Sequence, residues 1–178
     1  RPVLSSARAG EEALRKLRYG FLFDAAKKRG INKIALAHTV DDQAETVLMR
    51  LIRGTGLYGL ISIMPKREIK SFIHPENNKD KRHSLLGVTL IRPLIEVSRK
   101  EIEDYLIKIK ARPRIDKTNF DRLFLRNRLR HGILKELEEI NPGVKQALAG
   151  FATQAALDYD FMYQKSKPYI KPAAGKLI

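Results

Sequence analysis

The chain has 178 residues and no cysteine, which excludes disulfides, thiolate metal sites and cysteine nucleophiles within it. Its 35 Lys and Arg against 20 Asp and Glu give a net charge of +15, which favours a polyanionic partner, most commonly nucleic acid. No apolar run approaches the roughly 20 residues that span a bilayer, and residues 1–10 lack the apolar core of a signal peptide. We therefore expect a cytoplasmic protein with no membrane partner.

Residues 11–29 are predicted to form a helix that ends at Gly30, a residue suited to the position after a helix. An apolar stripe at helical spacing is expected to face the core. Its members are Leu14, Leu17, Phe21 and Ala25. Residues 31–37 then read as a short buried strand of a parallel sheet, so this helix and strand form the second half of a βαβ unit. We expect the first strand to lie upstream of Arg1.

A polar cluster follows this strand, at the start of a helix predicted over residues 41–53. Asp42 and Glu45 are three residues apart, so both side chains should project from one face of the helix, close to His38. One carboxylate at a helix start is usually a cap, whereas two beside a histidine are a candidate functional pair. The spacing matches no specific metal signature, and no metal site is predicted.

The opposite face of this helix is apolar and is expected to pack on the sheet. Its members are Ala44, Val47, Leu48, Leu51 and Ile52. Gly54, Gly56 and Gly59 should end the helix in a turn that needs positive φ or close backbone approach. Such a turn is either an ordinary C-terminal cap or a loop that passes close to a ligand.

The middle of the chain is predicted to be irregular over residues 65–86, with a hairpin around Asn77 and Asn78 as the alternative. A second apolar strand follows over residues 87–91. Ser98 and Glu101 form a capping box for a helix that extends to about Lys110. Four apolar side chains of this helix should point inward. They are Ile102, Tyr105, Leu106 and Ile109.

Arg126 and Arg130 lie four residues apart after a loop over residues 112–124, so they line one helix face. The like charges are costly unless an anion or acidic residues face them; phosphate contact and a solvated face are the two readings. A long helix is predicted over residues 144–163, followed by a linker. Its loose apolar stripe comprises Leu148, Phe151, Ala155 and Met162.

Several of these motifs together resemble the tRNA(Ile)-lysidine synthetase family, whose catalytic domain is a PP-loop (N-type) ATP pyrophosphatase. Each motif alone is weak, but their shared order over residues 11–142 makes the resemblance specific. The resembling segments are residues 11–19, 37–46, 53–60, 91–94, 116–119 and 126–130. The resemblance implies an α/β fold: the C-terminal part of a Rossmann-like PP-loop domain over residues 1–142, then a helical segment over residues 143–178 that leads toward a tRNA-binding region.

The resemblance also implies a ligase that forms a C–N bond. With ATP and Mg²⁺ as cofactors, the family adenylates C2 of the wobble cytidine of a tRNA(Ile) with a CAU anticodon. Free L-lysine then displaces AMP to give lysidine. Whether the protein forms a homodimer is left open.

Residue roles are carried over by position. Asp42 and Glu45 would bind the lysine, and both would be catalytic together with His38 and Arg18. ATP would be bound by Arg18, His38, Arg53 and Gly54. The tRNA would contact Arg92, Arg126, Arg128 and Arg130, or these arginines would order the site.

Two departures from the family pattern stand out. The family often has a second histidine after His38, where this chain has Thr39. The Ser-Gly-Gly-x-Asp-Ser phosphate loop does not occur in these residues, so we expect this fragment alone to be inactive. Two alternatives remain: a PP-loop tRNA thiolase-like enzyme, which would commonly use cysteines, and a non-catalytic basic RNA-binding module.

Overall fold

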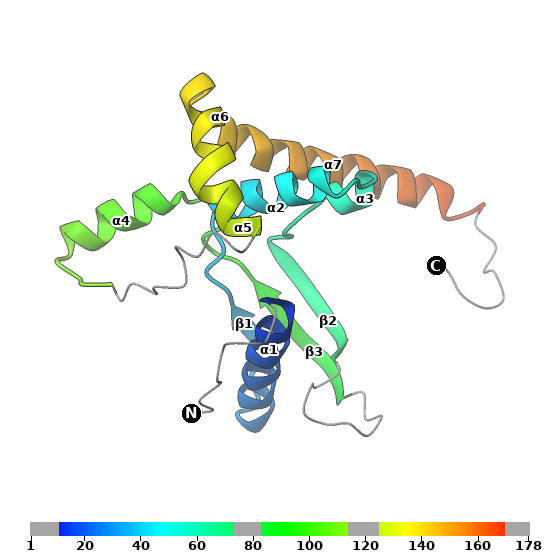
Figure 1. Cartoon of the computed structure of the whole chain (residues 1–178). Helices are drawn as coiled ribbons and strands as arrows, with labels where there is room; N and C mark the ends of the chain where they lie inside the picture. Colours follow the sequence, from blue (N-terminus) through cyan, green and yellow to red (C-terminus); the bar gives the residue numbers. More distant parts are fainter. Residues whose placement is uncertain (1–10, 73–82, 114–124, 170–178) are drawn as a thin grey trace. The chain divides into compact units, whose positions relative to one another are not determined.

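The structure is a computed structural model that describes residues 11–72, 83–113 and 125–169 (Figure 1). It contains two compact units, and each is described by itself. The first comprises residues 1–36 and 65–93, and the second comprises residues 37–64 and 94–178. The predicted division after Pro142 differs from these limits and stays a prediction.

The first unit is a helix packed on a three-stranded sheet. Helix α1 spans Glu11–Lys28, and the strands are β1 (Lys33–Ala35), β2 (Lys66–Phe72) and β3 (His83–Ile91). The strand order is β1-β3-β2, with β1 parallel and β2 antiparallel to the central β3. A parallel sheet was predicted for the strand at residues 31–37, but its pairing with β3 was not, and the predicted burial holds only for Ile34 of β1. The prediction of an irregular loop over residues 65–86 is wrong at both ends of this range, where β2 and the first part of β3 pair as two antiparallel strands, as the hairpin alternative expected. Residues 73–82 lie outside the described part.

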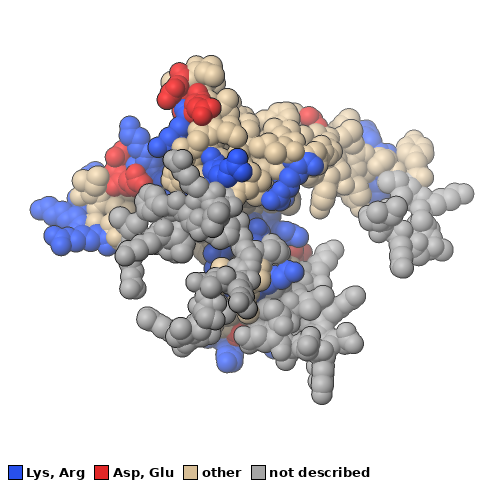
Figure 2. All heavy atoms as spheres, in the orientation of Figure 1, with Lys and Arg blue, Asp and Glu red and all other residues tan. Residues whose placement is uncertain are grey.

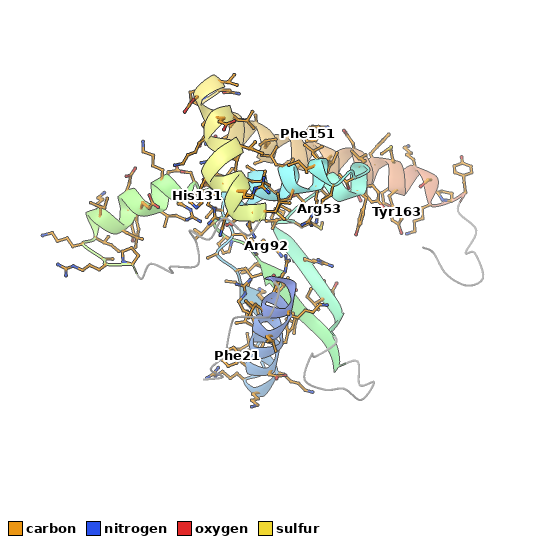
Figure 3. All side chains as sticks on the ribbon, in the orientation of Figure 1. Phe21, Arg53, Arg92, His131, Phe151 and Tyr163 are labelled. Carbon is orange, nitrogen blue, oxygen red and sulfur yellow. The ribbon has the colours of Figure 1, made fainter. Side chains whose placement is uncertain are left out.

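The core of the first unit lies between α1 and the sheet. It comprises Tyr19, Phe23, Ala26, Ile34, Val88 and Leu90. The predicted inward stripe of α1 is wrong at Phe21, whose side chain is 65% exposed (Figure 3). Gly30 has φ +64°, and the N–H of Ile31 donates to the carbonyl of Ala26, so the predicted glycine stop is confirmed.

The second unit is helical in its described residues. Helix α2 spans Val40–Ile52, α3 spans Leu57–Leu60, and α4 spans Arg99–Lys108. A continuous helical segment follows, made of α5 (Leu125–Arg128), the π-helical turn η2 (Leu129–Ile133) and α6 (Leu134–Ile140).

The long helix α7 spans Val144–Ser166, three residues beyond the predicted end at residue 163. It packs along α2 and α3 and buries Ala152 and Ala155, whose small side chains allow a close approach. Leu129 and Leu134 are the largest apolar side chains buried completely in this unit.

Several apolar positions predicted to face the core are exposed instead. The predicted burial is right for Ala44, Val47 and Ala155. It is wrong for Leu51, Ile52, Tyr105, Ile109, Phe151 and Met162, all between 45% and 61% exposed. Helix α2 packs against α7 and α3, and its predicted packing on the sheet stays a prediction. Among the described helices, none is long and apolar enough to cross a membrane.

Candidate carboxylate–arginine site

The first turn of α2 is fixed by a reciprocal cap between Thr39 and Asp42. The Asp42 backbone N–H donates to the Thr39 hydroxyl oxygen, while the Thr39 backbone N–H donates to Asp42 Oδ2 at 2.9 Å. This capping box satisfies two backbone donors that a helix start leaves open. Thr39, which departs from the family pattern, is therefore the N-cap of the helix. Because the cap uses Oδ2 of Asp42, Oδ1 remains to face other groups.

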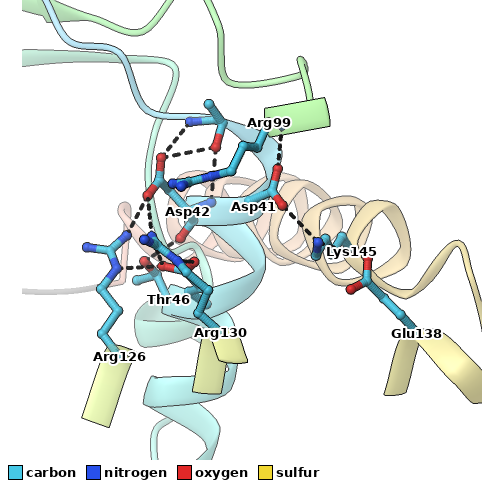
Figure 4. Close-up of polar contacts among 10 residues, drawn as sticks. Asp41, Asp42, Thr46, Arg99, Arg126, Arg130, Glu138 and Lys145 are labelled. Atoms are coloured by element: carbon cyan, nitrogen blue, oxygen red, sulfur yellow. Dashed lines mark hydrogen bonds and ion pairs between the residues drawn. The ribbon is translucent and has the colours of Figure 1, made fainter. Parts of the chain in front are cut away.

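Asp42 and Glu45 project together from one face of α2, as the three-residue spacing predicts, and both bind arginines. Figure 4 shows Asp42 facing Arg126. Arg126 spans the pair: its Nη2 donates to Asp42 Oδ1 at 2.8 Å and its Nε donates to Glu45 Oε2 at 2.6 Å. Arg130 holds Glu45 through both oxygens, with Nε–Oε1 at 2.5 Å and Nη2–Oε2 at 3.0 Å. Two carboxylates and two guanidiniums thus form one cluster, here called the carboxylate–arginine site.

Burial makes the pairing necessary. The Glu45 side chain is only 1% exposed, and an ionised carboxylate that far from water is stable only with charged hydrogen-bond donors. Burial by itself lowers the pKa of Arg130, but its hydrogen bonds and attraction to Glu45, with further attraction to Asp42 and Asp41, raise that pKa above its ordinary value. The acidic residues that would make the Arg126–Arg130 spacing tolerable are therefore present.

Asp41, next to this site, serves a separate ion-pair network. Its Oδ1 lies 2.9 Å from Lys145 Nζ in the first turn of α7, and its Oδ2 accepts the Arg99 backbone N–H at 2.7 Å where α4 begins. Lys145 also pairs with Glu138 of α6 at 2.8 Å. Burial opposes ionisation of Asp41, but the Lys145 ammonium and the Arg99 N–H lower its pKa below the ordinary value. Asp41 thereby ties together the starts of three helices.

The glycine turn after α2 shows both predicted uses of glycine. Gly54 has φ +75°, a conformation that favours glycine. Gly59 approaches Thr55 so closely that an added Cβ would lie 1.7 Å from the Thr55 hydroxyl oxygen. The turn is held to α2 by two side chains that the sequence analysis did not select: Arg50 donates to the Gly59 carbonyl, and Gln43 Oε1 accepts the Ile63 N–H at 2.9 Å.

The other predicted site residues have distinct locations. His38 is half-buried directly before the α2 cap, whereas Arg53 and Arg128 are exposed. Arg18 and Arg92 belong to the first unit, Arg18 exposed on α1 and Arg92 7% exposed after β3. Residues 116–119 of the resemblance lie outside the described part.

Asp41 and Lys145 were missed by sequence reasoning. The only signals were the doubled Asp41-Asp42 and a lysine in the first turn after Pro142-Gly143, and neither specifies a partner. Within the described ranges, no group of three or more His, Asp or Glu side chains is placed to hold a metal ion.

The fold is an α/β domain of the Rossmann-like class. It has a parallel strand pair covered by a helix, and after β1 the chain leads into the start of α2, which carries a charged cluster. The chain belongs to the family of PP-loop domains, whose model matches residues 4–137. A PP-loop domain is an ATP-binding domain, so ATP binding is a property of this family.

Its curated relatives include tRNA(Ile)-lysidine synthases. That of Thermosipho africanus is 43% identical over 141 residues, which cover 79% of this chain and 28% of the relative. That of Geobacter sulfurreducens is 40% identical over 148 residues, 83% of this chain and 28% of the relative. That of Thermotoga maritima is 36% identical over 166 residues, 93% of this chain and 35% of the relative. The chain thus spans about a third of the length of these proteins.

Among solved structures, the U34-tRNA thiolase NcsA from Methanococcus maripaludis, with its [4Fe-4S] cluster, has a TM-score of 0.57 and 16% sequence identity. The match covers 86% of this chain and 47% of the thiolase. At this level of identity, the similarity concerns the fold.

Proposed function

We propose that the protein that carries this chain is a ligase that joins L-lysine to C2 of the wobble cytidine in a tRNA(Ile) with a CAU anticodon. The proposal is supported by the lysidine synthase relatives, at 36–43% identity over most of this chain. The structural observation that carries it is the convergence of Asp42 and Glu45 on one face of α2, where they bind cationic nitrogen groups.

ATP, when bound, supplies the adenylyl group that converts the C2 oxygen of cytidine into a leaving group, and pyrophosphate is released. The C2–O bond then breaks as AMP departs, and a C–N bond forms to the lysine ε-amine, which must be neutral and lose a proton. The contribution of this chain is to bind lysine as a cation, to orient its ε-amine, and to accept on a carboxylate the proton that this amine loses.

The two carboxylates are not equally available to lysine. The carboxylate oxygens of Glu45 accept hydrogen bonds from both arginines, and its side chain is 1% exposed. Asp42 is 15% exposed, and its Oδ1 has one close partner, Arg126, with Arg130 Nη2 farther away at 3.7 Å. We therefore assign the lysine ammonium contact mainly to Asp42, and the anchoring of both arginines to Glu45.

The arginines also set a condition for lysine binding. Two carboxylates and two guanidiniums have no net charge, so an added lysine cation leaves the cluster positive. A phosphate that attracts Arg126 or Arg130 would free a carboxylate oxygen and balance this charge. ATP or tRNA binding should therefore favour lysine binding, which unites the two roles proposed for these arginines: contact with tRNA and order in the site.

The remaining assignments follow from the family resemblance. Arg18, His38, Arg53 and Gly54 are proposed to contact ATP, and Arg92 and Arg128 to contact tRNA. Since the described residues offer no metal-binding cluster, we place Mg²⁺ on the ATP phosphates, with no ligand assigned from these residues.

The test uses the full-length protein and the variant Asp42→Asn, with Asp104→Asn on the exposed surface of α4 as the matched control. We measure lysine-dependent AMP release from ATP and tRNA(Ile), together with tRNA affinity. Asp42→Asn should reduce AMP release at least tenfold or raise the lysine KM by a similar factor, with tRNA affinity nearly unchanged. Equal activity of Asp42→Asn and Asp104→Asn would remove Asp42 from the lysine site.

Two alternatives give different outcomes. A basic RNA-binding module would show no AMP release and would lose RNA affinity only when arginines are replaced. A thiolase would transfer sulfur to the tRNA; thiolases commonly use cysteines, and this chain has none.

A further inference from the structure

On one face of the sheet in the first unit, apolar side chains give way to arginines at the end of β3. On the face toward α1, Val88 and Leu90 are buried core residues, and Ile69 packs against the same core opposite Val88. Residues directly opposite each other in an antiparallel pair share a face, as do residues two apart on one strand. Arg67, opposite Leu90, therefore lies on the same face as the apolar residues. Arg92 comes directly after the end of β3, two residues beyond Leu90.

Helix α1 adds a third arginine at this place. Arg15 Cζ lies 5.6 Å from the centroid of the Tyr19 ring, and Tyr19 belongs to the core between α1 and the sheet. The Tyr19 hydroxyl is in turn a hydrogen-bond partner of Arg92. The backbone N–H of Arg92 donates to the Pro65 carbonyl at 2.9 Å, which fixes the strand end that carries it. Arg15, Arg67 and Arg92 are here called the arginine cluster.

Mutual repulsion acts within this cluster. Burial lowers the pKa of Arg92 below its ordinary value, the Tyr19 hydroxyl acts against this, and the charges of Arg67 and Arg15 lower the pKa further. Like charges gathered at one end of the sheet are costly, and an anion placed among them would relieve the cost. Guanidiniums are suited to this because their planar pairs of N–H donors match phosphate oxygens.

We propose that the arginine cluster is a phosphate-binding site. Arg15 and Arg67, both exposed, would bind the phosphate oxygens directly, with Arg92 behind them, held by Tyr19. The ligand chemistry is a phosphate group, which an RNA backbone and ATP both supply. In naming these ligands the proposal rests on the proposed function, and it adds Arg15, Arg67 and Tyr19 to the residues that serve it.

The chain offers a matched control at the other end of the same helix. Lys28 and Arg29 are exposed. Lys28 is the last residue of α1 and Arg29 follows it, so both lie at the other end of the helix from Arg15. The variants Arg15→Gln/Arg67→Gln and Lys28→Gln/Arg29→Gln each remove two positive charges. Any effect of total charge on binding is therefore the same in both double variants. A difference in binding between the two variants must come from the location of the lost charges.

The experiment measures binding of the full-length protein and both variants to tRNA(Ile) over a range of salt concentrations, and binding of ATP, both without lysine. If the phosphate belongs to RNA, the negative slope of log K against log salt should become shallower by about 1.5 for Arg15→Gln/Arg67→Gln. The control should change it little. If it belongs to ATP, the ATP Kd should rise at least fivefold in the first variant only. Arg92→Lys, which keeps the charge but loses the planar donor pair, should give a smaller change of the same kind.

Equal RNA slopes and equal ATP affinities in the two double variants would overturn the phosphate site. Because lysine is absent, this result does not depend on lysidine formation. Conversely, a protein that makes no lysidine but shows the location-dependent change would keep the phosphate site and lose the proposed reaction.

Discussion

Arg130 Nε lies 2.5 Å from Glu45 Oε1, and this bond joins two residues that are 85 positions apart in the chain. Arg126 donates to the other oxygen of the same Glu45. The buried carboxylate of α2 is therefore bound by two arginines from a distant part of the chain. Basic side chains are also spread over the visible face of this unit in Figure 2, but these two arginines face inward to acidic partners. The carboxylate–arginine site is therefore a structural element as well as a candidate lysine site.

Removal of the Glu45 charge should destabilise the protein strongly. Glu45→Gln leaves Arg126 and Arg130 without their main anion, and breaking a buried ion pair costs about 3 kcal/mol. The free energy of unfolding from urea titration should fall by this amount. Glu139→Gln, at an exposed position of α6, should change it by less than about 0.5 kcal/mol. Equal stability of the two variants would show that the buried pairing contributes nothing.

Two substitutions of Thr39 should separate the stabilising effect of its hydroxyl cap from that of its side-chain shape. Thr39→Val keeps the branched side chain but removes the hydroxyl that accepts the Asp42 N–H, so it should cost about 1 kcal/mol. Thr39→Ser retains the hydroxyl and should stay close to the original stability. If thermal unfolding gives the opposite order, packing of the Thr39 methyl group dominates over the cap.

Asp41 should give the protein an acid-sensitive stability. Because its pKa is lower in the folded state, the ion pair with Lys145 stabilises the fold above the ordinary pKa of 3.8, and the contribution is lost as pH falls through the lower folded value. Asp41→Asn should therefore lower the melting temperature near pH 6. The difference from the unmodified protein should shrink below pH 3.8. A difference that stays constant down to pH 2 would contradict this assignment.

Lys145 gives the complementary prediction at high pH. Burial lowers its pKa, but Glu138 and Asp41 raise it above the ordinary value of 10.5. Its stabilising contribution is thus complete below pH 10.5 and is lost as pH rises through the higher folded value. Lys145→Met should destabilise the protein at pH 7, whereas Lys135→Met, at an exposed position of α6, should have little effect. Similar unfolding curves for both would remove Lys145 from the network.

The close contact at Gly59 predicts a rescue between two positions. Gly59→Ala would place a Cβ 1.7 Å from the Thr55 hydroxyl oxygen, so the Thr55 side chain or the turn must shift, at a cost of about 1 kcal/mol. Thr55→Ala removes that oxygen, and the double variant should recover most of the loss in thermal unfolding. No recovery would mean that another neighbour of Gly59 sets the cost.

Local patterns in the sequence predicted local structure well. The Ser98–Glu101 capping box, the glycine stop at Gly30 and the shared face of Asp42 and Glu45 depend only on residues a few positions apart. These features follow from helix geometry and needed no knowledge of the tertiary fold.

Features that depend on distant partners were not predictable in the same way. The basic, polar composition of residues 65–86 concealed β2 and the first part of β3, whose strand character comes from pairing with each other. Phe21 fits an apolar stripe, but the sheet packs against Tyr19 and Phe23 instead. The acidic partners of Arg126 and Arg130 could be required on physical grounds, yet only the fold shows that they are Asp42 and Glu45.

The formation of lysidine is tested directly by mass spectrometry of nucleosides from tRNA(Ile) incubated with the full-length protein, ATP and isotopically labelled L-lysine. The label should join the wobble cytidine, AMP should be released in equal amount, and neither should occur without ATP. An unlabelled wobble cytidine in the presence of active ATP turnover, or a cytidine that carries sulfur instead, would contradict lysidine formation.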